Sequence, residues 1–216
     1  MQGRELIVSR AARFFRDGDL VNLGIGMPTQ VANYLPEGVE IQLQSENGFI
    51  GIGPTPTAED WDHDVVNAGG QPASIVPGGC TFDSCMSFGL IRGGHVDATV
   101  LGALEVDQEG NLANWIIPGK KVPGMGGGMD LVAGANMVIV TMEHCTKSGA
   151  PKILKKCSLP LTAAHEVDYI VTELCVLHYN GQGLVLEELA PGVTVEEVVA
   201  KTEAELIIPE HIGSME

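Results

Sequence analysis

Short stretches rich in valine and isoleucine alternate with helical segments along this chain, and this alternation constrains its fold more than any other feature. Buried strands are indicated at residues 97–106, 136–142 and 169–177. Strands of this kind, separated by helices, are typical of a parallel sheet that is covered on both faces. We therefore predict the α/β class, with a mainly parallel open sheet, helices on both faces and a single domain over residues 1–216.

The spacing of apolar and turn-forming residues places further elements. Before Glu46 it predicts a helix at 2–16, a strand at 19–23, a helix at 28–35 and a strand at 39–43. After Glu46 it predicts a loop at 48–56, a short strand at 73–76 and a helix at 83–90 capped by Asp83. Further along it predicts a long ordered loop at 112–129 and an edge strand at 184–188. The last predicted element is a helix at 194–203, opened by the capping box of Thr194 and Glu197.

The charge balance restricts the ligands that this chain can bind alone. It has 28 acidic and 12 basic residues, a formal net charge of −16, and no lysine or arginine between Arg16 and Arg92. This balance argues against nucleic acid as a partner, because nucleic-acid binding requires basic surfaces. An anionic ligand bound by the N-terminal half would need backbone N–H groups, distant lysines or a second chain.

Cysteine usage and the N-terminal sequence predict a cytoplasmic location. No apolar run approaches the ~18 residues of a membrane span, so we expect no membrane association. Residues 1–15 lack the apolar segment and small-residue cleavage site of a signal peptide. The five cysteines are odd in number and form no C-x-x-C motif, which predicts reduced thiols.

Two local groups of reactive residue types are interpreted as structural. His144 and Cys145 are adjacent, but neighbouring residues of a strand face opposite sides, so we do not expect a nucleophile and its base. The acidic cluster at 60–64 lacks the glycine and the distal glutamate of an EF-hand. We expect a polar loop at this cluster and no metal site in the chain.

The glycines of the N-terminal half leave one distant alternative open. Glycine accounts for 28 of the 216 residues, nearly twice the usual ~7%. The turn Gly24-Ile25-Gly26 follows a strand and opens a helix, and Glu46 lies about 20 residues further on, as in a dinucleotide-binding fingerprint. Thr29 occupies the position of the third glycine of that fingerprint. A nicotinamide-dinucleotide-binding oxidoreductase is therefore the more distant alternative.

Glu46 is a lone carboxylate just past a strand, and glycine-rich backbone follows it. Such a carboxylate can act as a base, a metal ligand or a nucleophile, or it can cap a turn; the absence of a His or Cys cluster argues against a metal. The glycine run at 124–128 can present N–H groups to an oxyanion, or can form a tight turn. Lys120 and Lys121 precede this run and can meet a ligand anion or stay solvated.

These residues also carry a resemblance to a known family. The motif Ser45-Glu46-Asn47-Gly48, followed by Gly51-Ile52-Gly53-Pro54, resembles the active-site signature of the β subunits of family I (3-oxoacid type) CoA-transferases. The likeness continues in order along nearly the whole chain. Its further segments are residues 21–29, 66–70, 87–95, 112–120, 124–127, 142–144 and 159–162.

The resemblance implies a transferase with a β-subunit-like fold and a defined set of site residues. Glu46 would be the nucleophile, and Gly127 would contribute to an oxyanion hole. Coenzyme A would be a substrate, with no permanently bound cofactor, and a separate α subunit would supply much of its site in a heterodimer or heterotetramer. The further positions expected around the substrate are Gly24, Gly26, Asn47, Gly48, Gly51, Gly53 and Gly126.

The residues at 81–88 resemble those of acetate/butyrate–acetoacetate CoA-transferase β subunits. This implies transfer of CoA between short-chain acyl groups of the acetyl, butyryl or acetoacetyl type and a carboxylate acceptor, in short-chain fatty acid or ketone body metabolism. The implied chemistry is ping-pong, through a glutamyl-CoA thioester on Glu46. Succinyl-CoA:3-oxoacid and 3-oxoadipate CoA-transferase β subunits are the nearer alternatives. Gly128 departs from the family pattern, in which alanine is commoner.

Overall fold

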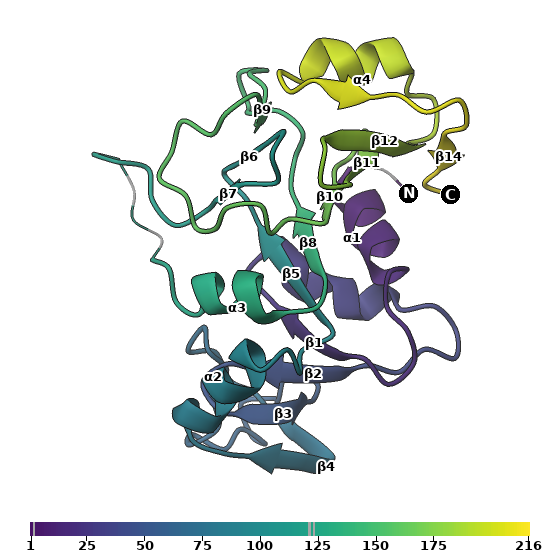
Figure 1. Ribbon diagram of the computed structural model, residues 1–216. Coiled ribbons are helices and arrows are strands. Elements are labelled where there is room, and N and C mark those ends of the chain that lie inside the picture. The colour runs from purple at the N-terminus through teal and green to yellow at the C-terminus, as the bar shows by residue number, and fades with distance from the viewer. Residues whose placement is uncertain (2, 121, 123) are drawn as a thin grey trace.

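The computed structural model describes residues 1, 3–120, 122 and 124–216, which form a long central sheet, a small second sheet and short helices (Figure 1). The strands of the central sheet are β1 (Leu20–Leu23), β2 (Gln42–Ser45), β3 (Phe49–Ile52), β4 (Ile75–Thr81), β5 (Ala98–Gly102), β8 (Val138–Thr141), β10 (Tyr169–Val171), β11 (Cys175–Tyr179), β12 (Leu184–Leu189), β13 (Leu206–Ile207) and β14 (Gly213–Ser214). The small sheet contains β6 (Glu105–Asp107), β7 (Leu112–Ala113) and β9 (Ile153–Leu154). The helices are α1 (Arg4–Ala12), α2 (Ser84–Arg92), α3 (Gly128–Gly134), α4 (Val195–Lys201) and the 3-10 helix η1 (Met27–Tyr34).

The central sheet is parallel in its middle, has antiparallel pairings on either side, and ends at β12 with parallel pairings to β13 and β14. Its strand order is β13-β12-β11-β10-β8-β5-β1-β2-β3-β4, with β14 also beside β12. Every pairing from β10 through β8, β5 and β1 to β2 is parallel. Antiparallel pairings join β2 to β3, β3 to β4, β10 to β11 and β11 to β12. The carboxyl ends of β1, β2 and β5 therefore meet at one edge, and the predicted α/β class with a mainly parallel open sheet is confirmed.

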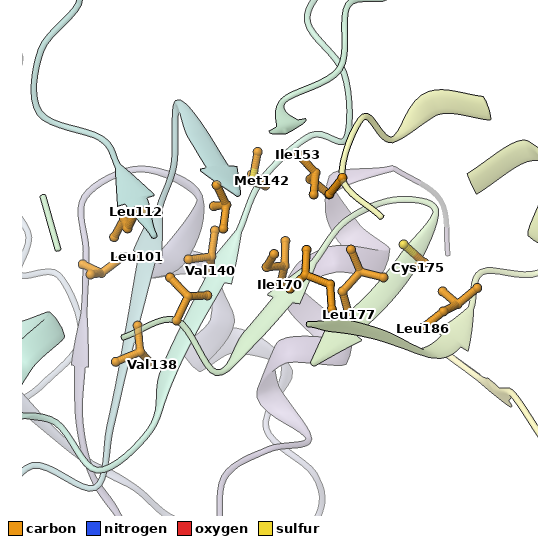
Figure 2. Packing of buried hydrophobic residues seen from close by; sticks show 14 of the residues in the cluster. Leu101, Leu112, Val138, Val140, Met142, Ile153, Ile170, Cys175, Leu177 and Leu186 are labelled. Atoms are coloured by element: carbon orange, nitrogen blue, oxygen red, sulfur yellow. The ribbon is translucent and has the colours of Figure 1, made fainter. Parts of the chain in front are cut away.

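Alternate residues of the central strands face two separate cores. Val100 of β5 and Ile139 of β8 pack in one cluster with the buried residues of α1. Their neighbours Leu101 and Val140 belong to a second cluster on the opposite side, and Figure 2 shows this cluster running across several strands. Val132 of α3 joins the second cluster. Helices therefore cover both faces of the sheet, as predicted from the apolar strand sequences.

Both ends of the chain belong to the part of the fold around α1. Figure 1 shows the two termini near α1 and β14. Met215 is fully buried in the same core cluster as Leu6 and Ile7 of α1. Arg10 of α1 also forms a short ion pair with Glu188 of β12, with Nε 2.6 Å from Oε2. The first helix and Met215, which follows the last strand, are thus packed into one core.

Two helix starts follow the predicted caps. The Asp83 side chain accepts a hydrogen bond from the backbone N–H of Met86 at 2.8 Å and begins α2. Thr194 accepts from the N–H of Glu197 at 3.2 Å and begins α4, while Glu197 Oε1 pairs with Lys201 Nζ at 2.7 Å, so only the threonine half of the predicted capping box is observed. Both bonds satisfy N–H groups that the first helical turn leaves unpaired. No helix within the described residues is long and apolar enough to cross a membrane.

The single strand predicted at 169–177 is wrong, because the structure has the antiparallel hairpin of β10 and β11 there. The hydroxyl of Thr172 accepts hydrogen bonds from the N–H groups of Leu174 and Cys175, both at 3.2 Å. This side-chain-mediated turn reverses the chain without glycine or proline. The single strand predicted at 97–106 is also divided, since β5 ends at Gly102 and β6 belongs to the small sheet.

The loop predicted at 48–56 contains β3, which pairs with β2 and β4. Its glycines made it look irregular, but Gly51 is needed for close strand approach, since a Cβ there would lie 2.9 Å from the Cα of Gly79. The loop predicted at 112–129 contains β7 and the start of α3, and Lys121 and Pro123 lie outside the described residues.

The remaining differences concern position, helix type or place in the sheet. The helix predicted at 2–16 is α1 at 4–12, with Gln2 outside the described residues, and the helix predicted at 28–35 is a 3-10 helix. The strand predicted at 39–43 lies at 42–45, the one at 73–76 lies at 75–81, and the one at 136–142 lies at 138–141. The strand at 184–188 was predicted at an edge, but it is β12, which lies between β11 and β13.

Close packing of α2 against α3 positions the segment that precedes α3. A Cβ at Gly134 would collide with the carbonyl oxygen of Ile91, so the helices approach at a distance that only glycine allows. An ion pair joins them as well, with Arg92 Nε 2.6 Å from Asp130 Oδ1. The glycine run before α3 is thereby held over α2 and the carboxyl end of β2.

His144 and Cys145 do not form a nucleophile–base pair. The buried His144 ring lies 3.0 Å from Thr172 Oγ1 and 2.8 Å from Thr202 Oγ1, so both ring nitrogens have hydroxyl partners. Burial is the main cause that lowers the pKa of His144 to about 4, and the charges of Lys201 and Lys152 lower it further. Burial also raises the pKa of the Cys145 thiol. His144 is therefore a neutral structural residue.

The depressed pKa of His144 predicts a loss of stability in mild acid. The unfolded chain, with a His pKa near 6.5, binds this proton before the folded protein does as the pH falls. Stabilisation from neutral His144 is complete above about pH 6.5 and is lost as the pH falls towards 4. Relative to a His144→Gln variant, the wild type should lose about 2 kcal/mol between pH 7.5 and pH 5 in urea-unfolding measurements.

The exposed His211 supplies the matched control for this measurement. A His211→Gln variant loses an exposed imidazole and should keep the wild-type free energy of unfolding at pH 7.5 within about 0.5 kcal/mol. Equal pH dependence of wild type and His144→Gln would contradict the assignment of a neutral buried histidine.

Candidate active site

An open cleft of about 1020 Å³ lies at the carboxyl ends of β1, β2 and β5. Ligands of α/β sheets bind at this edge, where loops from several strands converge. The cleft also receives the glycine run that precedes α3. Its lining comes from segments within residues 22–33, 43–55, 67–71, 101–114 and 124–131.

Glu46 enters the cleft directly after the last residue of β2. The N–H of Gly48 donates to the carbonyl of Ser45 at 3.0 Å, so the chain turns sharply around Glu46 into β3. Gly48 has φ +132°, and a Cβ on it would collide with the carbonyl oxygen of Phe82. This glycine therefore fixes the turn that presents the half-buried Glu46 side chain.

Buried amides lie directly beneath Glu46. Asn22 of β1 is paired in register with Gln44 of β2, and both are 2% exposed. Asn22 Nδ2 donates to Gln44 Oε1 at 2.9 Å and lies 3.4 Å from Glu46 Oε2. Gln44 Nε2 in turn donates to the hydroxyl of Ser87 on α2 at 3.0 Å. The carboxylate thus faces a hydrogen-bond donor that the sheet itself positions.

The structure brings Glu46 and Gly127 together. A Cβ added at Gly127 would lie 3.1 Å from Glu46 Cγ and 3.3 Å from the ring of Phe88. Within the described residues the N–H of Gly127 has no hydrogen-bond acceptor, whereas the N–H of Gly128 donates to Met125 at 3.0 Å. Gly127 therefore places an unoccupied backbone donor close to the only carboxylate that lines the described part of the cleft.

The residues on either side of Glu46 hold the loop at 66–71 beside the cleft. Ser45 Oγ accepts from the N–H of Ala68 at 2.9 Å. Asn47 Nδ2 donates to the carbonyl of Val66 at 2.8 Å. One short motif thereby provides the carboxylate and the tethers for a neighbouring wall.

The described lining of the cleft contains one ionisable side chain, that of Glu46. Its other polar side chains are amides and hydroxyls, from residues such as Gln30, Asn67 and Asn114. Among the described residues, no group of three or more His, Cys, Asp and Glu side chains is arranged to hold a metal ion. The cluster at 60–64 forms local contacts, with Asp62 Oδ1 accepting from the N–H of Asp64 at 3.0 Å.

The positions predicted around the substrate divide into two groups. The residues that line the cleft are Gly24, Glu46, Gly53, Gly126 and Gly127. Those outside this lining are Gly26, Asn47, Gly48 and Gly51. For Asn47, Gly48 and Gly51 the structure shows a role in shaping the turn, the loop and the strand pairing next to Glu46. Their contact with substrate stays a prediction.

Sequence reasoning did not single out Asn22, Gln44 and Ser87. In the structure Asn22 faces Glu46, Gln44 is hydrogen-bonded to Asn22, and Ser87 is hydrogen-bonded to Gln44. One signal was present: Asn22 interrupts an apolar run, Leu20 to Leu23, that otherwise reads as a buried strand. A buried amide requires partners, but the sequence does not show which strand supplies them.

A carboxylate beside a backbone donor, in a cleft with no described cation, suits acyl transfer. The carboxylate can attack a thioester carbonyl, and a preorganised N–H can stabilise the oxyanion that forms. The arrangement requires no metal to activate the attacking group.

Comparison with known proteins identifies the family. The model of the coenzyme A transferase family matches residues 4–201. The chain is 60% identical to the beta subunit of the acetate CoA-transferase of Haemophilus influenzae, over all of its length and 96% of that protein. It is 50% identical to one subunit of a probable succinyl-CoA:3-ketoacid coenzyme A transferase of Bacillus subtilis, over 98% of each chain.

The fold agrees with this relationship. The structure matches an acyl-CoA transferase from Escherichia coli O157:H7 with a TM-score of 0.77 and 22% identity, over 99% of this chain. It spans 43% of that chain, so the solved protein contains this fold as less than half of its length. With 60% identity to one curated member and a family match over most residues, the chain belongs to the coenzyme A transferase family.

The contact between Gly127 and Glu46 predicts a selective effect of one methyl group. Gly127→Ala should displace the Glu46 side chain by a few tenths of an ångström and lower CoA-transferase activity about 3- to 10-fold, because the rate depends on the position of the reacting group. Gly128→Ala is the matched control, since a Cβ there meets nothing nearer than Thr162 Cγ2 at 3.9 Å. Steady-state kinetics and thermal melting should show lost activity with retained folding for Gly127→Ala, and equal activity of the two variants would contradict the assignment.

Proposed function

We propose that this chain is the β subunit of a CoA-transferase that moves CoA between a short-chain acyl-CoA and a carboxylate acceptor. The observation that carries the proposal is the closeness of Glu46 to the backbone of Gly127, where an added Cβ would lie 3.1 Å from Glu46 Cγ, inside a cleft whose described lining holds no other charge. We further propose that residues 1–216 form one domain, supported by the continuous central sheet that spans Leu20 to Ser214.

The reaction begins with a carboxylate oxygen of Glu46 attacking the thioester carbonyl of the acyl-CoA. The carbon–sulfur bond breaks, CoA leaves as a thiolate, and a mixed anhydride joins the acyl group to Glu46. The thiolate then attacks the Glu46 carbonyl carbon, releases the acyl group as its carboxylate and leaves CoA as a thioester on Glu46. The acceptor carboxylate repeats these steps in reverse order and departs as its CoA ester.

A carboxylate is a weak nucleophile, so the rate must come from position and electrostatics. Holding the carboxylate against the thioester can contribute about 7–11 kcal/mol. A donor such as the N–H of Gly127, aimed at the oxyanion, contributes roughly 3–4 kcal/mol. The glycines that line the cleft let backbone approach the reacting atoms and leave less room for water, which would hydrolyse the thioester.

Apart from Glu46 the described lining is uncharged, which supports a small monocarboxylic acyl group. The H. influenzae relative is named for acetate, and the B. subtilis relative for succinyl-CoA and a 3-ketoacid. A succinyl group carries a second carboxylate, which would enter a cleft whose described residues offer no lysine or arginine. An unpaired charge in such a site is costly. We therefore favour the acetate/butyrate type over the succinyl type, which stays the second candidate.

A partner chain completes the proposed site. Both curated relatives are named as one subunit of an enzyme. Coenzyme A carries several negative charges, while this chain has no cation between Arg16 and Arg92 and none in the described cleft lining. We propose that an α subunit supplies a basic, CoA-facing surface, and that coenzyme A acts as a substrate with no permanently bound cofactor.

Replacing the proposed nucleophile tests the mechanism. Glu46→Gln removes the attacking oxygen's charge while keeping the side-chain shape, so turnover should fall by at least ~10⁴-fold with the fold intact. Mass spectrometry of the complex with its α subunit, after addition of acyl-CoA, should show a CoA adduct on the Glu46 peptide of the wild type and none for Glu46→Gln. The adduct should be sensitive to borohydride.

Other outcomes of this experiment are equally informative. Retained turnover in a pure Glu46→Gln sample would overturn the nucleophile assignment. NAD-dependent absorbance changes without an adduct would support the dinucleotide-binding alternative. The absence of both signals in the assembled wild type would indicate a non-catalytic binding subunit.

Competition between acyl donors tests the substrate class. With acetate as acceptor, kcat/KM should be higher for butyryl-CoA than for succinyl-CoA by at least ~10-fold, because the second carboxylate of succinate lacks a partner on this chain. Acetoacetyl-CoA serves as an uncharged control of similar length. Equal or greater kcat/KM for succinyl-CoA would favour the succinyl-CoA:3-oxoacid alternative.

A further inference from the structure

A chain of buried amides connects α2 to the carboxylate of Glu46. Ser87, Gln44 and Asn22 come from three different elements, and each is at most 2% exposed. Hydrogen bonds of 3.0 Å and 2.9 Å link them in that order, and Asn22 Nδ2 ends the chain 3.4 Å from Glu46 Oε2. Polar groups at this depth cost free energy unless they are paired, so their arrangement is constrained by hydrogen bonding.

The Asn22 amide is oriented by contacts that do not involve Glu46. Its nitrogen lies 3.2 Å from the backbone oxygen of Gln44 and 2.9 Å from Gln44 Oε1, and with Glu46 Oε2 at 3.4 Å its two N–H bonds are shared among three acceptors. A backbone oxygen can only accept, so the reversed amide would place Oδ1 against it and against the carboxylate. The Asn22 nitrogen can only donate, so Gln44 turns its Oε1 towards Asn22 and its Nε2 towards the hydroxyl of Ser87 at 3.0 Å. The donor that faces Glu46 is therefore preorganised.

Asn22 holds one carboxylate oxygen and leaves the other free. It approaches Oε2, and within the described residues Oε1 of Glu46 makes no hydrogen bond. At 3.4 Å the contact is long for a hydrogen bond to a charged group. It can therefore restrain the carboxylate without occupying the oxygen that attacks. In a cleft with no described cation, this N–H also replaces part of the hydration that the ionised Glu46 loses.

We propose that Asn22 orients the Glu46 carboxylate for attack, and that Gln44, anchored on Ser87, is a positioning residue that fixes the Asn22 amide. The inference rests on the proposed function, since it assumes that Glu46 is the nucleophile. It adds two residues to the reaction and assigns a function to the packing of α2 against β2.

Thr99 offers a control in the same layer of the sheet. It lies beside Asn22 in register on β5, is fully buried, and its hydroxyl has no partner within the described residues. The structure shows no contact of its side chain with Glu46. Thr99→Val keeps the shape and removes a buried hydroxyl, so it should leave both folding and kcat unchanged.

The test uses the complex with its α subunit and compares Asn22→Asp, Gln44→Met and Thr99→Val. Asn22→Asp removes the donor and should lower kcat about 10- to 100-fold, with KM for acyl-CoA changed less than about 3-fold. In the wild type, Glu46 is the one ionisable side chain in the described lining. The Asn22→Asp substitution places a second carboxylate opposite it, and two facing carboxylates disfavour each other's ionisation. The acid limb of the kcat profile should therefore move to higher pH. Gln44→Met should lower kcat less, with an unchanged acid limb.

The possible outcomes separate this inference from the proposed function. Wild-type kcat and pH profile in folded Asn22→Asp and Gln44→Met would overturn the positioning roles while leaving the nucleophile assignment intact. A lower melting temperature with an unchanged kcat per folded enzyme would likewise overturn them, because substitution of a residue with only a structural role lowers stability without changing kcat. If Asn22→Asp fails to fold, Gln44→Met decides the question through its kcat. An assembled wild type without transferase activity would overturn both proposals.

Discussion

The contact that the site depends on is the close approach of α2 and α3. Gly134 lets α3 lie against the backbone of Ile91, which no side chain at that position would permit. The approach places Gly127 against Phe88 and Glu46. Since α2 also carries Ser87, one helix contacts both the glycine segment and the amides beneath the carboxylate. A shift of α2 would therefore disturb the attacking group and its backbone donor together.

The sequence predicted the elements whose determinants are local. Asp83 and Thr194 begin helices because each satisfies the N–H groups of its own first turn. The hairpin of β10 and β11 was missed because its turn uses the Thr172 hydroxyl, without the glycine or proline that usually marks a reversal. The strand β3 was missed because Gly51 signals a loop, whereas here it permits close contact with Gly79. The turn contact is local but uses a residue that rarely marks a reversal, whereas the contact of Gly51 with Gly79 joins residues far apart in the sequence.

The same limit applies to the site. Glu46 could be found from the sequence because it stands alone, after a strand and before glycines, and because a family signature surrounds it. Asn22 and Gln44 could not be assigned in this way, since their roles come from the register of β1 against β2. That register is a pairing between residues 22 positions apart, decided by the packing of both strands in the sheet. Nearby sequence therefore identifies the reactive group more readily than its supports.

The arrangement of the two chain ends has a consequence for how such enzymes are assembled. The residues that line the cleft fall between Asn22 and Leu131, whereas the buried residues of α1 and Met215, which share a core, are not among them. A second polypeptide could therefore be joined covalently to either end without passing through the substrate cleft. The solved acyl-CoA transferase, of which this fold occupies 43%, is a single chain of more than twice this length. Attachment of this fold to further chain is thus compatible with an open cleft.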